Sequence, residues 1–151
     1  MMRPLKTIFV ANIVGLLALG TAGAITPEQV EIPNSDGKLR ALLYRPTGPG
    51  PFPVVIGLHG CGGIIGASGA PGMRYPDWGE RLASAGIAVL YPDSFGSRGL
   101  GSQCSVRVRT VRAERERVAD VESARRWLQS QTWTMPDRVS LMGWSNGAIF
   151  E

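Results

Sequence analysis

The segment Gly143-Trp144-Ser145-Asn146-Gly147 is the part of this 151-residue sequence whose residue types and spacing best fit a chemical step. It matches the pattern G-x-S-x-G, in which a serine on a sharp turn between a strand and a helix serves as a nucleophile. The two glycines let the strand and helix backbones pass close together, while the serine sits in a strained position between them. Such a serine attacks a carbonyl carbon, so the chemistry to expect is acyl transfer. The alternative is an ordinary strand-to-helix turn with Ser145 as the helix N-cap.

A second glycine-rich segment, His59-Gly60-Cys61-Gly62-Gly63, follows an apolar run. In hydrolases with a serine turn of this kind, a loop at this place gives one backbone N–H group of the oxyanion hole. The residue after the nucleophile gives the other. Cys61 and Asn146 are therefore the candidate donors. The alternatives are a loop without a ligand and a dinucleotide-binding loop, but Ile65 stands where the latter needs its third glycine.

Two further residues could take part in this chemistry. His59 is the only histidine in the sequence. It precedes the expected oxyanion donor within one short loop, whereas the triad order in such hydrolases is Ser, then acid, then His. We therefore expect it to shape the loop by hydrogen bonding rather than to act as the base. Arg98, in the loop after the apolar run Ile87–Tyr91, could contact a substrate carboxylate. A solvated loop arginine is the alternative.

The strands that must position these residues are read from turn signals and apolar runs. Asp36-Gly37 is a turn signal between Val30–Ile32 and Leu39–Tyr44, and Arg45-Pro46 indicates that the second of these strands lies at a sheet edge. Three apolar runs are typical of strands buried on both faces. They are Val54–Leu58, Ile87–Tyr91 and, after a turn at Asp137-Arg138, Val139–Met142.

Two helices are expected between these strands. Trp78, Leu82 and Ala85 share one face of the first helix, and Gly86 can end it. The second runs over Val111–Gln129 and has an inward stripe formed by Val118, Val121, Ala124 and Leu128. Apolar strands that alternate with helices indicate an α/β fold, with a mostly parallel sheet and helices on both faces.

The first 24 residues have the three parts of a secretory signal peptide. Arg3 and Lys6 form a basic start, Ile8–Leu19 is almost wholly apolar, and Ala22-Gly23-Ala24 supplies small residues at cleavage-site spacing. An uncleaved anchor is the alternative, but the apolar core is shorter than the roughly 20 residues that a spanning helix needs. We therefore expect cleavage after Ala24 and a secreted or periplasmic protein with no membrane partner.

Composition and charge fit an ordinary folded domain. Charged residues make up 19% and hydrophobic residues 44% of the chain, which excludes a disordered protein. Loss of the signal peptide removes two of the 16 basic residues and none of the 12 acidic ones, so the net charge falls from +4 to +2. The arginines of Arg107–Arg126 are interleaved with acidic residues, as on a solvated helix face. We therefore expect no nucleic-acid partner.

The sequence has two cysteines, Cys61 and Cys104. In an exported chain they could form a disulfide. They could equally be a small buried side chain and a loop thiol. There is no C-x-x-C pair and no histidine cluster, so we expect neither a metal site nor a cofactor.

Three segments together resemble the dienelactone hydrolase family of the α/β-hydrolase superfamily. They are His59–Gly63, Tyr91-Pro92-Asp93-Ser94-Phe95-Gly96 and Gly143–Gly147. The resemblance spans about Val30 to the last residue and implies the α/β-hydrolase fold, with a triad acid and histidine after later strands. Two positions depart from the family: Ser145 stands where well-known members use cysteine, and Gly60 where they place a glutamate.

These observations predict that residues 25–151 are the N-terminal part of a dienelactone hydrolase-like domain. We expect a serine hydrolase acting on a small-molecule carboxylic ester or lactone, with Ser145 as nucleophile. The chain ends six residues after Ser145, and no histidine follows it. We therefore expect a truncated fold that lacks its C-terminal strands and is inactive alone. The alternatives are a secreted serine peptidase of the same fold and a non-catalytic binding module.

Overall fold

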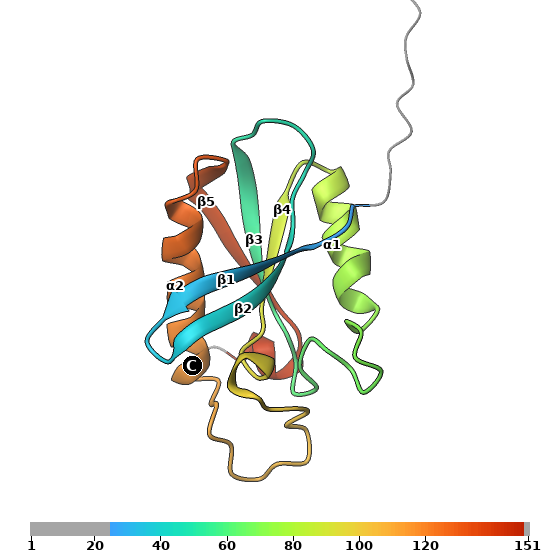
Figure 1. The fold of residues 1–151 in the computed structure, drawn as a ribbon, viewed down its shortest axis with the longest axis vertical. Helices are drawn as coiled ribbons and strands as arrows, with labels where there is room; N and C mark the ends of the chain where they lie inside the picture. The colour runs from blue at the N-terminus through green and yellow to red at the C-terminus, as the bar shows by residue number, and fades with distance from the viewer. Residues whose placement is uncertain (1–24, 150–151) are drawn as a thin grey trace, which may run out of the picture.

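A five-stranded sheet with a helix on each face makes up the described part of the chain, residues 25–149 of a computed structural model (Figure 1). The signal peptide predicted for residues 1–24 lies outside the described residues. The elements in chain order are β1 (Glu28–Asn34), β2 (Gly37–Tyr44), β3 (Phe52–Leu58), α1 (Arg74–Ser84), β4 (Ala88–Pro92), the 3₁₀ turn η1 (Gly96–Arg98), α2 (Glu116–Gln129), β5 (Thr134–Gly143) and the 3₁₀ turn η2 (Ser145–Ala148).

The strand order is β1-β2-β4-β3-β5, and β3 is parallel to both β4 and β5. This parallel core confirms the alternation of strands and helices predicted from the sequence. The predicted hairpin is also present, as an antiparallel β1–β2 pair. The expectation that β2 lies at the sheet edge is wrong, because the β2 residues Ala41–Tyr44 pair with β4 on the other side. β1 is the edge strand instead.

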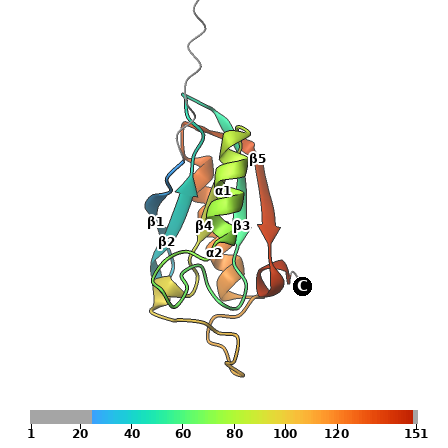
Figure 2. The same ribbon diagram turned by 90° about the vertical axis from the view of Figure 1, so that its right-hand side faces the viewer.

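The two faces of the sheet carry separate apolar cores. On one face, Ile56 and Leu90 of the sheet pack with Ala124 and Leu128 of α2. On the other face, the core includes Tyr44, Tyr91 and Ala83 of α1. Figure 2 shows α1 and α2 on opposite sides of the sheet. The loops after β3, β4 and β5 gather at one end, the lower end in Figure 1, which is where open parallel sheets bind ligands.

The inward face of α1 differs from the predicted one. Trp78 and Ala85 are exposed, whereas Tyr75, Gly79 and Ala83 are buried. The helix is rotated because Gly79 lies directly on the ring of Tyr44: a Cβ atom at Gly79 would be 2.5 Å from that ring. The predicted end is confirmed, since Ala85 caps the helix and Gly86 follows with a φ of 82°. None of the helices in residues 25–149 could cross a bilayer, being too short or too polar.

The second helix, α2, begins at Glu116 and not at Val111, and its inner stripe is partly polar. Val118, predicted to face the core, is 41% exposed. Ala124 and Leu128 are buried as predicted, and Arg117, Asp120 and Ser123 are buried with them. The sequence pattern favours valine on the inward face because arginine and aspartate side chains are normally solvated. The structure buries them because each has hydrogen-bond partners on other elements.

The last strand, β5, is longer and more exposed than predicted. It begins at Thr134, so Asp137-Arg138 lies inside the strand, where the register with β3 shifts, and not in a turn. Leu141 is 48% exposed, so the expectation of a strand buried on both faces is wrong for β5. Together with Val118 and Ile149, Leu141 lines an apolar groove of about 130 Å³ between α2 and β5.

The residue that follows β3, His59, is fully buried. Its ring packs edge-on against Phe95, with 4.6 Å between ring centroids. Its Nδ1 lies 2.8 Å from the carbonyl oxygen of Gly60, as expected for a neutral ring that donates from Nδ1. Burial, and secondarily the charge of Arg117, lowers the pKa of His59 to about 4. His59 is therefore neutral at neutral pH.

The contact between Gly79 and Tyr44 gives a stability prediction. Glycine-to-alanine exchange inside a helix normally stabilises by about 1 kcal/mol. Here we expect Gly79→Ala to lower the free energy of unfolding by about 1–3 kcal/mol, because the new methyl group overpacks the buried Tyr44 ring. Urea unfolding followed by circular dichroism measures this. Gly101→Ala, where an added Cβ meets nothing within 4 Å, is the control. An equal effect of the two exchanges would contradict the packing described for α1.

The burial of His59 predicts a pH dependence of stability. Because the pKa of His59 is about 4 in the folded chain and 6.5 in the unfolded chain, protons bind preferentially to the unfolded state. The contribution of neutral His59 to the free energy of unfolding is complete above pH 6.5. It is lost as the pH falls towards 4, by up to about 3 kcal/mol. When the free energy of unfolding is measured with urea across this pH range, it should change less with pH in His59→Asn than in the wild-type protein. Identical slopes in the two proteins would show that His59 does not titrate in this way.

Candidate active site

Ser145 lies on the sharp turn between β5 and η2. Its φ of 53° makes it the one residue other than glycine with a positive φ in residues 25–149. A serine in this region costs of order 1–3 kcal/mol, so the surrounding structure must hold it there. The side chain is exposed, and Trp144 rather than Ser145 occupies the N-cap position. The turn therefore presents the hydroxyl to solvent and does not use it as a helix cap.

The glycines on either side of Ser145 are required by backbone contacts. A Cβ atom at Gly143 would lie 2.1 Å from the carbonyl oxygen of Gly147. At Gly147 it would lie 2.3 Å from the carbonyl oxygen of Leu58 and 2.6 Å from that of His59. No side chain can relieve these contacts, because the neighbouring atoms belong to the backbone. The turn after β5 is thus packed directly onto the C-terminal end of β3.

The loop that begins at His59 passes beside Ser145. A Cβ atom at Gly60 would be 3.4 Å from Cβ of Ser145 and 3.9 Å from its Oγ. A longer side chain at position 60, such as the glutamate of the dienelactone hydrolase pattern, would therefore start beside the serine. Glycine leaves the space next to Ser145 open.

The predicted oxyanion donors, Cys61 and Asn146, lie on the two segments that meet here. Within residues 25–149, neither backbone N–H group donates to a protein acceptor. Both are thus free to donate to a ligand, although backbone N–H groups in folded proteins are normally paired. The structure brings their segments together through the parallel β3–β5 pairing, in which Leu58 lies opposite Gly143.

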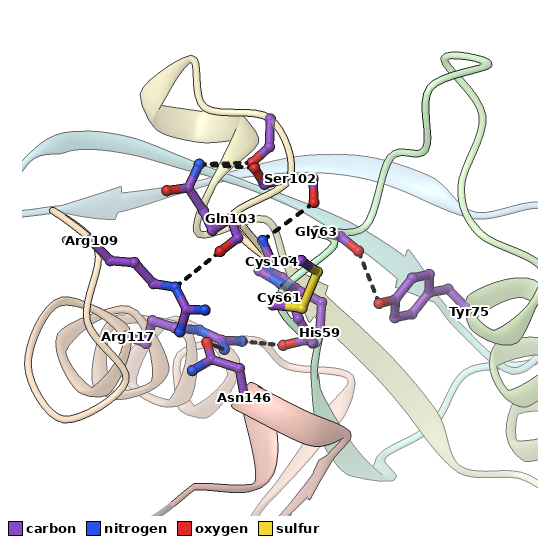
Figure 3. Close-up of a disulfide and its surroundings, with 12 residues drawn as sticks. His59, Cys61, Gly63, Tyr75, Ser102, Gln103, Cys104, Arg109, Arg117 and Asn146 are labelled. Carbon is purple, nitrogen blue, oxygen red and sulfur yellow. Dashed lines mark hydrogen bonds between the residues drawn. A yellow bond between two sulfur atoms is a disulfide. The ribbon is translucent and has the colours of Figure 1, made fainter. Parts of the chain in front are cut away.

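A disulfide between Cys61 and Cys104 holds the loop after β3, with 4.8 Å between the Cα atoms. The sequence left this bridge open as one of two alternatives, and the structure forms it (Figure 3). The backbone N–H of Gln103 also donates to the carbonyl oxygen of Cys61 at 2.8 Å. Cys61 is therefore fixed through both its side chain and its carbonyl group to the segment that precedes α2.

The sequence did not single out Arg117, which is only 4% exposed. Its Nη1 donates to Oδ1 of Asn146 at 2.8 Å, and its Nη2 donates to the carbonyl oxygen of His59 at 2.6 Å. Figure 3 shows the guanidinium between these two partners. One signal could have identified it: Arg117 precedes Val121 by four residues and Ala124 by seven, so it falls on the inward stripe of the helix.

His59 is not placed as a base for Ser145. Its Nδ1 is directed to Gly60, and no hydrogen bond joins its ring to Ser145. Its Nε2 is buried and has no partner among the described side chains and backbone groups. The hydrogen bond to Gly60 is of the loop-shaping kind expected from the sequence.

The structure gives Arg98 a different role from the substrate contact considered in the sequence. All five N–H donors of its guanidinium are used, by Asp36, Asp120 and the carbonyl oxygen of Ser94. Asp120 is buried, and its carboxylate receives two parallel bonds of 2.9 Å from Arg98. The substrate-binding assignment is therefore corrected: Arg98 ties η1 to α2 and to the β1–β2 turn.

Several solved structures share this arrangement of strands and helices. A dienelactone hydrolase of Klebsiella pneumoniae superposes with a TM-score of 0.62 and 20% identity, over 81% of this chain and 50% of that one. A dienelactone hydrolase-like promiscuous phosphotriesterase from metagenomic libraries gives a TM-score of 0.65 and 18% identity, over 83% of this chain and 51% of that one. A thermophilic carboxylesterase from a metagenomic library superposes with a TM-score of 0.58 and 23% identity, over 83% of this chain and 38% of that one.

The chain therefore spans about half, or less, of the length of these structures. A family model, that of the prolyl oligopeptidase family, matches residues 77–150. No curated protein was found to match the sequence. The solved structures have the fold predicted from the sequence, and the matched family region includes α2, β5 and the Ser145 turn. The chain therefore shares the α/β-hydrolase fold with these structures.

Proposed function

We propose that the protein that carries this chain is a serine hydrolase that acts on small-molecule carboxylic esters or lactones, with Ser145 as its nucleophile. One observation carries the proposal: an exposed serine is held at a positive φ between two glycines that backbone contacts require. A turn with this geometry presents the hydroxyl group at the end of a parallel strand, where a nucleophile is needed. The dienelactone hydrolase and carboxylesterase among the similar structures support the ester class.

The proposed reaction begins when Oγ of Ser145 attacks the ester carbonyl carbon, as a histidine takes the hydroxyl proton. That histidine belongs to sequence outside residues 1–151, because His59 is directed to Gly60. The backbone N–H groups of Cys61 and Asn146 bind the oxyanion of the tetrahedral intermediate. The alcohol then leaves with the proton from the histidine, and water releases the acid from the acyl-enzyme by the same steps.

A peptidase is the second candidate function, because the family model that matches residues 77–150 is that of the prolyl oligopeptidase family. Ester and peptide hydrolysis share the nucleophile and the oxyanion hole. They differ in the leaving group and in the pocket that receives the substrate.

We also propose that the protein is exported, to the periplasm or beyond the cell. The signal-peptide pattern of residues 1–24 supports this location. The disulfide between Cys61 and Cys104 supports it independently, because structural disulfides persist mainly in oxidising compartments.

The nucleophile can be tested by covalent labelling. A fluorophosphonate probe should label the full-length protein, and the label should disappear in Ser145→Ala, because the probe reacts with an activated serine hydroxyl. Ser84→Ala is the matched control, since Ser84 is an exposed serine at the end of α1. Gel fluorescence or intact mass measures the label. Labelling that persists in Ser145→Ala would assign the reactive serine elsewhere.

Comparison of two substrates separates the candidate functions. We expect the full-length protein to hydrolyse p-nitrophenyl acetate with a higher kcat/KM than a proline-containing peptide p-nitroanilide, and Ser145→Ala to lose both activities. Absorbance of the released nitrophenol or nitroaniline measures the rates. A higher kcat/KM for the peptide would favour the peptidase. A folded protein that turns over neither substrate would favour a binding module.

A further inference from the structure

Arg117 has contacts that bear on the geometry of the oxyanion hole. It bonds to Asn146, which lies 29 residues later, and to the carbonyl group of His59, which lies 58 residues earlier. These two partners belong to the segments that carry the candidate oxyanion donors. Asn146 is itself one donor residue, and His59 precedes the other, Cys61, by two positions. One side chain therefore spans the two halves of the proposed site.

The charge of Arg117 is buried without a carboxylate partner among the described residues. Among residues 25–149, no carboxylate forms an ion pair with it. Asp120, one turn later on α2, is bound to Arg98 instead. Burial lowers the pKa of Arg117 to about 10, so the guanidinium stays protonated at neutral pH. Its positive charge is thus directed at an amide oxygen and a carbonyl oxygen, and it also lies 5.5 Å from the ring centroid of Phe95.

Burial of a cation without a carboxylate partner is costly, because the charge loses its hydration. A residue retained only to hold α2 against β3 would not need a charge at this position, since well-packed apolar side chains do the same at lower cost. What the guanidinium adds is its planar pair of donors. These donors fix the distance between an acceptor in η2, Oδ1 of Asn146, and an acceptor just after β3, the carbonyl oxygen of His59.

We propose that Arg117 is the positioning residue of the oxyanion hole, and that it sets the relative placement of the backbone N–H groups of Cys61 and Asn146. This inference rests on the proposed serine hydrolase function. Arg117 does not touch the substrate in this scheme. It acts through Asn146 and His59, so its removal displaces the donors from the developing oxyanion and leaves substrate binding in the ground state unchanged.

The test uses p-nitrophenyl acetate hydrolysis by the full-length protein with Arg117→Ala and Arg117→Lys. We expect kcat to fall about 10- to 100-fold in Arg117→Ala, less than the 10²–10³-fold typical of a lost donor, because both N–H groups remain. KM should change less than threefold. Guanidinium ion at millimolar concentration should restore part of kcat in Arg117→Ala. Arg117→Lys should not recover wild-type kcat, because an ammonium group cannot span both acceptors in the planar arrangement.

Gly79→Ala is the control for stability, because its added methyl group crowds the ring of Tyr44 and neither Arg117 nor its partners, so kcat should stay unchanged below its unfolding temperature. If the Arg117 variants do not fold, Asn146→Ala gives the same test. It keeps the backbone donor but removes the acceptor of Arg117, so kcat should fall with little change in KM. Unchanged kcat in the variants that fold, or a rise in KM alone, would overturn the inference. Failure of the proposed function is distinct: the wild-type protein would then show neither ester turnover nor Ser145 labelling.

Discussion

The contact between the turn after β5 and the end of β3 is the constraint on which the site depends. Gly147 lies against the carbonyl oxygens of Leu58 and His59 so closely that no Cβ atom fits, and the N–H of Trp144 donates to Leu58 at 3.2 Å. The parallel β3–β5 ladder brings these groups together. Once it is formed, Ser145 can leave the strand only by a sharp turn, which is why this serine has a positive φ. The position of the hydroxyl is thus determined by backbone packing.

A buried polar network continues from this contact along α2. Arg117 binds the site segments, while Asp120, one turn further, receives the guanidinium of Arg98. The pKa of Arg98 is raised, chiefly by its hydrogen bonds to Asp120, so the guanidinium stays protonated. Asp120 also accepts from the side-chain amide of Asn34 at 2.6 Å. The same helix therefore connects the proposed site, the loop after β4 and the outer hairpin through the buried charges of Arg117 and Asp120.

The sequence predicted the parts of this structure that depend on local signals. The Ser145 turn, the hairpin at Asp36-Gly37 and the central apolar strands are encoded within a few residues each. The inward faces of α1 and α2 were predicted only in part, for tertiary reasons: Gly79 packs on a tyrosine from a distant strand, and Arg117 is buried because its acceptors lie in η2 and just after β3. The role of Arg98 was misassigned for the same reason, since its partners lie 62 and 22 residues away.

The two proposed oxyanion donors are held by different kinds of bond, and this difference bears on how the site works. Cys61 is held covalently through Cys104 and by the N–H of Gln103, so its loop cannot move far from the segment before α2. Asn146 is held through its side chain by one hydrogen bond from Arg117, which lies in the first turn of α2. Both restraints thus converge on one stretch of chain, residues 103–117. Preorganised donors stabilise a developing charge without reorganisation at the moment of reaction. A stretch that fixes both donors supplies that preorganisation, and the nucleophile itself is fixed separately by the glycine contacts of β3 and β5.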